Sequence, residues 1–297
     1  DKMKLLFFSI ILTISPILAQ CDCNDDEILD VLDIVVAVDC ILQYPYPDGF
    51  ECYCYGCNID GVEGILGIVS MVDCIINDCW DGETVTDIDG NIYETVFIGQ
   101  QEWISENLKV THYNNGDEIL TGLTGLEWES LDNSETGAFS VYDDNPENID
   151  VYGNLYNWYA VDDDRSICPV GFHVPSDEDW MELEMALGMS YEEANEWLFR
   201  GTNEGSQLAG TADLWQDGDL ESNGEFGSSG FFALPGGFRY YIVNSPYYYL
   251  GSNGYFGSST SAGPTFAWNR GLDYNYSEIH RYILDKRFGF SVRCVGN

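Results

Sequence analysis

Hydrophobic and polar positions alternate over short stretches in much of this chain, a pattern typical of half-buried β-strands. Residues 84–99, TVTDIDGNIYETVFIG, contain two such stretches around an Asp-Gly-Asn turn and predict a strand, a turn and a second strand. Residues 177–187 instead carry apolar side chains at helical spacing. They follow Ser176, a suitable N-cap, with Asp179 three residues later. A second helix is predicted near residues 191–199, and strands are predicted at the end of the chain.

A different pattern fills the first 80 residues, where an acidic loop precedes an apolar helical face over residues 31–42. Six loop positions offer oxygen atoms to a metal ion, five through side chains and one through its carbonyl group: Asp22, Asn24, Asp26, Asp30, Asp33 and the carbonyl of Ile28. Calcium takes six to eight oxygen ligands, which a loop supplies at alternate positions as it wraps the ion. The loop therefore predicts a calcium site that opens a helix.

This loop–helix unit occurs twice, because a shift of 34 residues places Cys23 on Cys57 and Asn24 on Asn58. The second loop keeps only Asn58 and Asp60 as side-chain ligands, so we expect it to bind calcium weakly. The duplicated unit resembles a dockerin, a paired loop–helix module that binds cohesin domains. That resemblance implies a small all-α module over residues 21–80, with calcium as its cofactor.

The dockerin resemblance also implies two antiparallel helices, in which the start of one lies near the end of the other. The symmetry of such a pair suggests two disulfides, Cys23–Cys74 and Cys40–Cys57. Four further cysteines stay unassigned: Cys21, Cys52, Cys54 and Cys79. A zinc site is the alternative for these cysteines, but only one C-x-x-C motif is present and no histidine lies near it.

Dockerins contact their partner through residues just before the last loop ligand. Here those residues are two apolar pairs: Val31 with Leu32, and Ile65 with Leu66. Two interpretations remain open, since the pairs could form a docking surface or belong to the core of the module. A docking surface would bind a cohesin-like protein, a neighbouring subunit or the second domain of this chain.

The first 20 residues predict a secretory signal peptide, with two lysines, an apolar run and a small-residue cleavage site. Lipidation of Cys21 is the alternative. A secreted or cell-surface location fits the ten cysteines of the chain, because disulfides persist in oxidising compartments. The formal net charge of −40 repels nucleic acid and anionic membranes, and favours cations as partners. The apolar run is also shorter than a spanning helix needs, so no membrane span is expected.

Residues 81–297 carry several short motifs that act together: QEWISENL, GNLYNW, CPVGFHVPS, LPGGFR and a terminal GFSVRCV. In combination they resemble the Fibrobacter succinogenes major paralogous domain, a bacterial extracellular module. Their order is also similar to C-type-lectin-like folds and to the related formylglycine-generating enzyme. The expected fold class is therefore α+β: an all-α dockerin-like calcium module followed by a C-type-lectin-like α+β domain. Within this resemblance, Cys168 and Cys294 are interpreted as one structural disulfide, which makes an enzyme of the formylglycine type an unfavoured alternative.

Residues 240–255, YYIVNSPYYYLGSNGY, are the best candidate for a ligand surface. Tyrosine rings stack on sugar rings, and amide and hydroxyl groups bind sugar hydroxyls. The candidate ligand-binding residues are Tyr247, Tyr248, Tyr249, Asn253, Tyr255, Asn269 and Arg270. The alternative is that these aromatic residues form the core of a domain poor in leucine and isoleucine.

The sequence thus predicts a secreted, non-enzymatic protein that attaches through its first module and binds glycans or displays a surface through its second. Two alternatives are a structural subunit of an extracellular filament or surface layer, and a carbohydrate-active enzyme with an unrecognised pair of carboxylates.

Overall fold

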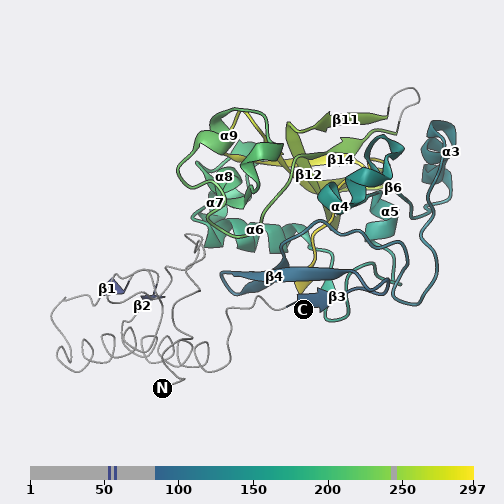
Figure 1. The fold of residues 1–297 in the computed structure, drawn as a ribbon, viewed down its shortest axis with the longest axis horizontal. Coiled ribbons are helices and arrows are strands. Elements are labelled where there is room, and N and C mark those ends of the chain that lie inside the picture. Colours follow the sequence, from purple (N-terminus) through teal and green to yellow (C-terminus); the bar gives the residue numbers. More distant parts are fainter. Residues whose placement is uncertain (1–52, 55–56, 59–83, 242–245) are drawn as a thin grey trace, which may run out of the picture. The chain divides into compact units, whose positions relative to one another are not determined.

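The computed structural model describes residues 53–54, 57–58, 84–241 and 246–297 (Figure 1). The chain divides into two compact units, Asp1–Asp81 and Gly82–Asn297. In the first unit the described elements are the strands β1 (Tyr53–Cys54) and β2 (Cys57–Asn58), which pair antiparallel with Cys54 opposite Cys57.

Most of the features predicted for the first unit fall outside the residues that the structure describes. They are the signal peptide, the calcium loop over residues 22–33, the ligand Asp60, the cysteines Cys21, Cys23, Cys40, Cys52, Cys74 and Cys79, and the apolar pairs Val31, Leu32, Ile65 and Leu66. No small all-α module is evident among the described residues of this unit.

A five-stranded sheet in the second unit has the order β3-β4-β5-β15-β8. Its strands are β3 (Thr84–Thr86), β4 (Ile92–Ile98), β5 (Gln101–Ile104), β8 (Phe172–His173) and β15 (Val295–Gly296). Asp87 Oδ1 accepts hydrogen bonds from the backbone amides of Asp89 and Asn91, which closes the turn between β3 and β4. The predicted strand, turn and strand of residues 84–99 are therefore confirmed.

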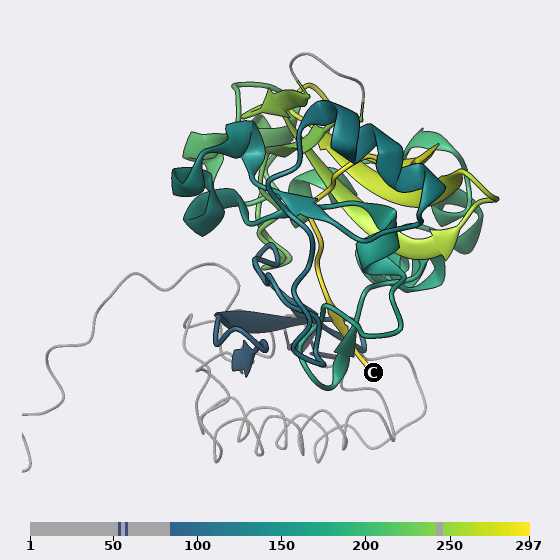
Figure 2. The same ribbon diagram turned by 90° about the vertical axis from the view of Figure 1, so that its right-hand side faces the viewer.

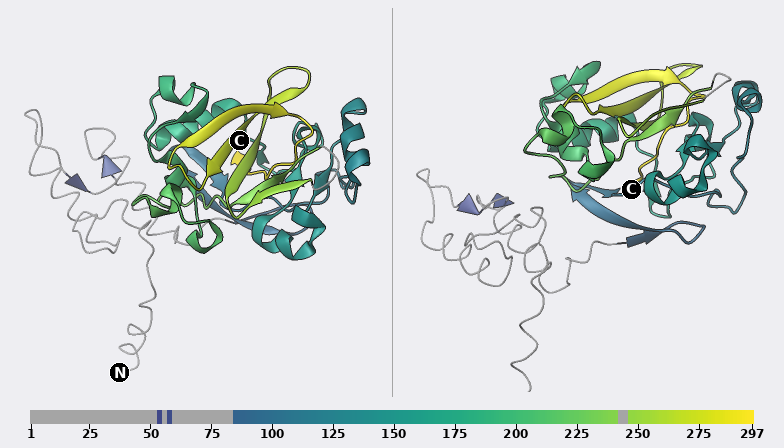
Figure 3. Two further views of the ribbon diagram at one scale, coloured as in Figure 1. Left: turned by 90° about the horizontal axis from the view of Figure 1, so that it is seen from above. Right: turned by 45° about the horizontal axis from the view of Figure 1, so that its top comes forward.

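A six-stranded sheet with the order β11-β10-β12-β13-β14-β9 forms the other layer (Figures 1 and 3). Its strands are β9 (Leu198–Arg200), β10 (Gly236–Arg239), β11 (Tyr247–Leu250), β12 (Asn253–Ser261), β13 (Phe266–Asp273) and β14 (Ile279–Asp285). The pairs β12–β13 and β13–β14 are antiparallel, and residues of the same register project from the same side of the sheet. A separate two-stranded sheet pairs β6 (Phe139–Ser140) with β7 (Leu155–Tyr156).

The helices of the described residues are short. The α-helices are α3 (Gly125–Glu129), α4 (Ile149–Tyr152), α5 (Trp158–Val161), α6 (Asp177–Ala186), α7 (Tyr191–Ala194), α8 (Glu204–Leu208) and α9 (Asp219–Ser222). The 3-10 helices are η2 (Ser130–Asn133), η3 (Tyr142–Asp144), η4 (Pro146–Asn148) and η5 (Ala212–Leu214). Helix α6 begins as predicted, because Ser176 Oγ accepts from the amide of Asp179 at 3.1 Å while the Asp179 carboxylate accepts from the amide of Ser176 at 2.7 Å.

Helix α6 lies between the two sheets and carries the centre of the core (Figure 1). Its Trp180 is fully buried and contacts Trp103 of β5 at 5.0 Å and Phe256 of β12 at 5.9 Å between ring centroids. Burial of a side chain of this size stabilises the fold by roughly 1.5–3 kcal/mol. One aromatic cluster therefore joins α6 to both sheets.

The C-terminal segment runs from the six-stranded sheet to the five-stranded sheet (Figure 2). Ser291 bridges to β12, and Val295 pairs with both β5 and β8. Between them, Cys294 forms a disulfide with Cys168, and the Cα atoms of the two residues are 5.9 Å apart. The predicted disulfide is thus present. It joins the loop before β8 to the residue before β15.

The predicted α+β fold class was wrong for this chain. The domain that the structure describes is mostly β, with 32% strand against 23% helix. The helix predicted at residues 191–199 ends at Ala194, because Phe199 pairs with His280 and extends the six-stranded sheet. Pairing with a distant strand therefore overrides the local pattern at Phe199. The Tyr-rich residues 240–255 contain β11 and the first residues of β12.

Candidate functional site: an aromatic face of the six-stranded sheet

One face of the six-stranded sheet packs on α6, and the opposite face carries a dense group of aromatic side chains. We call this opposite side the aromatic face. Its rings belong to Phe199, Phe238, Tyr240, Tyr248, Tyr249, Tyr255, Tyr276, Tyr282, Phe288 and Phe290. In the view from above, the strands of this sheet lie in front and the described helices lie around their rim (Figure 3, left).

The register of the paired strands places residues of four neighbouring strands in one row across this face. Tyr255 on β12 is opposite Gly271 on β13, Gly271 is opposite His280 on β14, and His280 is opposite Phe199 on β9. The rings of Phe199 and His280 are 3.7 Å apart between centroids, and Phe199 contacts Tyr276 at 4.2 Å. Four neighbouring strands thus contribute to one continuous row, with a glycine at its centre.

Gly271 allows the rings on either side of it to approach each other. A Cβ atom at this position would lie 3.3 Å from the Tyr255 ring and 3.5 Å from Nδ1 of His280. The backbone of β13 is therefore the floor between these two rings, and a larger residue would fill it.

Phe238 on β10 continues the row toward the other edge of the sheet. Its ring centroid is 5.2 Å from that of Tyr255, and 5.7 Å from those of both Tyr248 and Tyr249 on β11. Phe290 stacks on Tyr255 at 5.7 Å. Tyr248 and Tyr249 are 41% and 54% exposed, so the β11 end of the face is open to solvent.

Two polar side chains on this face have buried atoms without a hydrogen-bond partner among the described residues. Both ring nitrogen atoms of His280 are buried and unpaired, and so is Oδ1 of Asn269, whose Nδ2 donates to the carbonyl of Tyr282 at 3.2 Å. Burial lowers the pKa of His280 to about 4, so the imidazole is neutral near pH 7. A neutral imidazole offers one donor and one acceptor.

The opposite face of the sheet is held by a buried network of charges. Arg270 donates to Asp177 at 2.7 Å and to Glu184 at 2.6 Å, and both carboxylates belong to α6. Glu184 also pairs with Arg200, and Asp177 with Arg281. Each buried charge has an opposite partner, which is the condition under which such groups are tolerated. This network attaches α6 to the sheet and leaves no free group for a ligand.

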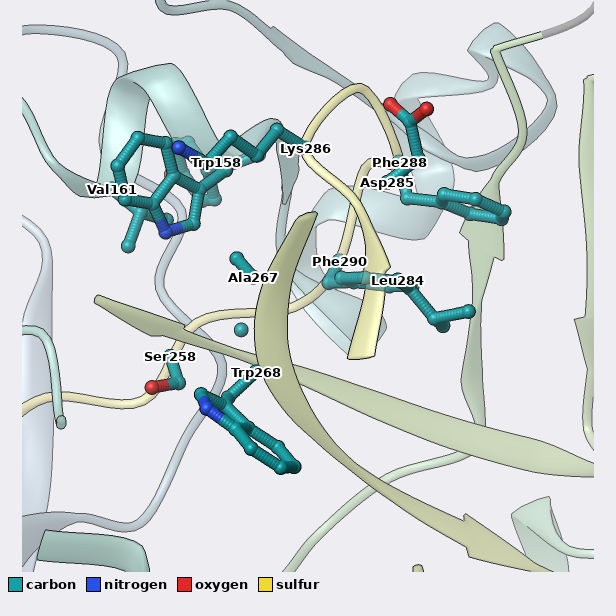
Figure 4. A pocket seen from close by; sticks show the side chains of 12 residues that line it. Trp158, Val161, Ser258, Ala267, Trp268, Leu284, Asp285, Lys286, Phe288 and Phe290 are labelled. Carbon is teal, nitrogen blue, oxygen red and sulfur yellow. The ribbon is translucent and has the colours of Figure 1, made fainter. Parts of the chain in front are cut away.

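One cavity of the described domain borders the aromatic face at Phe288 and Phe290, and a second is lined mainly by residues 94–109 and 149–153. The first, shown in Figure 4, lies among Trp158, Ala267, Trp268 and Phe290, and its volume of about 10 Å³ has room for one water at most. The second has about 310 Å³ and is lined by polar and apolar residues: Glu94, Ser105, Glu106, Asn107, Lys109, Ile149, Asp150, Val151, Gly153, Thr211, Phe232 and Leu234. Its size suits a small molecule, but no unpaired buried side chain borders it.

Comparison with known proteins decides the family of this domain. A family model described as the Fibrobacter succinogenes major domain matches residues 96–296. The chain belongs to the Fibrobacter succinogenes major domain family. No curated protein and no solved structure matches the chain.

In this Fibrobacter succinogenes major domain, the seven candidate ligand residues predicted from sequence are divided between the two faces of the six-stranded sheet. Tyr248, Tyr249, Tyr255 and Asn269 lie on the aromatic face. Asn253 is buried, and its amide donates to Asp273 at 3.0 Å.

Two of the candidates, Tyr247 and Arg270, lie on the other side of the sheet. Tyr247 is 8% exposed, and its hydroxyl group accepts from Arg239 and donates to Asp144. Arg270 is fully buried in the charge network under the sheet. Side chains of a strand alternate between faces, so these two residues point away from the aromatic face.

Sequence reasoning missed Phe199, Phe238, Tyr276, His280 and Phe288. Residues 279–285 do carry a signal, because His280, Tyr282 and Leu284 recur with a period of two. Phe199 carried no such signal, because the sequence predicted a helix near residues 191–199.

Among the described residues of this Fibrobacter succinogenes major domain, no group of histidine, cysteine, aspartate and glutamate side chains is arranged to hold a metal ion. The described part also contains no helix with the length and apolar character that crossing a bilayer requires.

Proposed function

We propose that the aromatic face binds neutral polysaccharide chains. The observation that carries this proposal is the continuous row of rings across the sheet, next to unpaired polar atoms of His280 and Asn269. The apolar face of a sugar stacks on an aromatic ring, while its hydroxyl groups need donors and acceptors beside that ring. A row that crosses several strands suits an extended chain of sugars.

The charge of the protein supports a neutral ligand. With a formal net charge of −40, the chain repels sulfated or uronate-rich polysaccharides at moderate ionic strength. The arginines beneath this sheet are already paired with carboxylates: Arg270 and Arg281 with Asp177, and Arg200 with Glu184. Stacking and hydroxyl contacts do not depend on ligand charge.

The proposed role is binding without catalysis. Formylglycine-type chemistry needs reactive cysteines, and here Cys168 and Cys294 are joined as a disulfide. A carbohydrate-active enzyme remains the alternative, and its signature would be the release of reducing ends from the bound polysaccharide.

The first unit is proposed to attach the protein outside the cell. This part of the proposal rests on sequence: an export signal over residues 1–20, a calcium loop over residues 22–33, and the apolar pairs at 31–32 and 65–66. Bound calcium would order the loop, and the apolar pairs would contact a cohesin-like protein, a neighbouring subunit or the second unit. A filament or surface layer is the alternative outcome, which electron microscopy of native material would reveal.

The binding proposal is tested with the full chain on gels that contain neutral polysaccharides, where binding retards migration. Tyr248→Ala with Tyr249→Ala should weaken binding about tenfold, because two exposed stacking rings are lost. Tyr191→Ala is the matched control: Tyr191 is 60% exposed on α7, away from the face, and its loss should change nothing. If wild-type protein migrates equally in gels with and without each polysaccharide, the proposal is wrong.

The calcium proposal is tested by calorimetry on the full chain. One strong binding event is expected, and Asp22→Ala with Asp33→Ala should abolish it, since these residues occupy the first and last loop positions. Two events of equal strength would contradict the weak second site.

A further inference from the structure

The centre of the aromatic face contains an arrangement that stacking alone does not explain. His280 is 4% exposed and Asn269 is 1% exposed, yet both ring nitrogen atoms of His280 and Oδ1 of Asn269 have no partner among the described residues. Buried polar side chains in folded proteins are nearly always hydrogen-bonded. Unpaired atoms on two adjacent strands of one face therefore point to a ligand that supplies the missing partners.

The two side chains lie on the same side of the sheet. His280 is opposite Gly271, and Asn269 is two residues before Gly271 on the same strand. A period of two along a strand returns to the same face. The unpaired atoms thus border the bare backbone at Gly271, whose other neighbour is the Tyr255 ring.

We propose that Gly271 is the floor of a central subsite, in which one neutral sugar stacks on Tyr255 and its hydroxyl groups bind His280 and Asn269 after the Phe199 ring turns aside. The inference rests on the proposed function and adds the position and the polar contacts of one sugar. Neutral imidazole and amide oxygen provide one donor and two acceptors, which suits sugar hydroxyl groups because each of them both donates and accepts.

Phe199 is the side chain that closes this subsite. Its ring lies 3.7 Å from His280, and it is 38% exposed. It belongs to β9, a three-residue strand at the edge of the sheet, and its ring also contacts that of Tyr276. Exposed side chains change rotamer within nanoseconds, so Phe199 can move without unfolding the strand.

The subsite is tested with His280→Phe and Gly271→Ala in the full chain, using neutral hexasaccharides of glucose, mannose and xylose as probes. His280→Phe keeps a ring of similar size and removes both nitrogen atoms. Gly271→Ala adds one methyl group to the floor. For the hexasaccharide that wild-type protein binds, each variant should show a Kd about tenfold higher. This is the change in affinity expected for the loss of roughly one hydrogen bond or contact.

Phe266→Ala is the matched control, because Phe266 is an exposed aromatic residue on the same strand, and its register places it on the opposite side from Gly271. Its Kd should equal that of wild type. A second measurement needs no variant and is therefore unaffected by folding defects. In wild-type protein, the ¹⁵N NMR signals of the His280 imidazole should shift when the hexasaccharide binds.

The outcomes separate the two proposals. Suppose that wild-type protein binds a hexasaccharide and that Tyr248→Ala with Tyr249→Ala weakens this binding. If His280→Phe and Gly271→Ala then bind normally and the imidazole signals do not move, the proposed subsite is wrong, while the proposal that the aromatic face binds polysaccharide is kept. If wild-type protein binds none of the probes or polysaccharides, both are wrong.

Discussion

At the scale of single residues, a buried basic side chain has different surroundings on each of the two faces of the six-stranded sheet. Arg270 is buried among carboxylates that satisfy its charge, whereas His280 is buried among rings that leave its nitrogen atoms unpaired. The first arrangement stabilises the packing of α6. The second disfavours the charged form of the side chain, because a desolvated imidazolium has no counterion in direct contact.

His280 should make stability depend on pH. Its pKa is lowered by burial to about 4, against 6.5 for the free side chain, although Asp273 raises it and Arg200 lowers it further. The unfolded chain therefore binds a proton between pH 6.5 and 4 that the folded chain does not. Stability is lost as pH falls through this range, by up to about 3 kcal/mol. Burial raises the pKa of the neighbouring Tyr255 and Tyr282, so both phenols stay neutral throughout this range.

Urea denaturation from pH 7 to pH 4 measures this effect as the difference between wild type and His280→Phe. The variant should show a shallower loss of stability over that range. Parallel curves would show that His280 titrates normally.

At the scale of elements, α6 connects the layers through a polar and an apolar contact. Trp180 packs between the sheets, while Asp177 and Glu184 bind the arginines of β9, β13 and β14. The helix begins at Ser176, whose capping hydrogen bonds satisfy amides that the first turn leaves free. Its position is thus fixed at one end by a cap and along one side by ion pairs.

Arg270→Ala should destabilise the domain by roughly 3–5 kcal/mol, because it leaves two buried carboxylates short of a partner. The matched variant Arg165→Ala also breaks two ion pairs, but its side chain is 39% exposed, so a loss of about 0–1 kcal/mol is expected. Thermal or urea unfolding measures both. Equal losses would show that the buried network contributes no more than a surface pair.

At the scale of the whole described domain, the end of the chain closes the fold. Ser291 bridges to β12 of one sheet and Val295 pairs with two strands of the other. Arg293 lies fully buried between them and donates to the carbonyls of Phe231 and Phe232. The disulfide of Cys294 spans 126 residues of sequence, so it restricts a large part of the unfolded chain.

Replacing Cys168 and Cys294 together with alanine should lower the free energy of unfolding by roughly 2–5 kcal/mol. Urea unfolding of this double variant against oxidised wild type gives the value. Mapping of non-reduced peptides by mass spectrometry should recover the Cys168–Cys294 link in wild-type protein. Free thiols at both positions would contradict the disulfide and restore the enzyme alternative.

Local pattern by itself determined several features of this protein. The turn between β3 and β4 and the N-cap of α6 at Ser176 were predicted correctly from local pattern. The family was predicted correctly from its short motifs, and the resemblance to it supplied the Cys168–Cys294 disulfide. Turns and caps are set by residues within four positions of each other, which a sequence displays directly. The family motifs are short runs of the same kind.

Tertiary structure alone decided the rest. Whether Phe199 is helical depends on His280, 81 residues away, and the local pattern of residues 191–199 gave no sign of that pairing. The faces of Tyr247 and Arg270 depended on strand register, because a shift of one residue exchanges the two sides of a sheet. The aromatic face exists only because six strands from residues 198–285 align their alternating side chains. Long-range backbone hydrogen bonds fix that alignment, and no local sequence pattern encodes it.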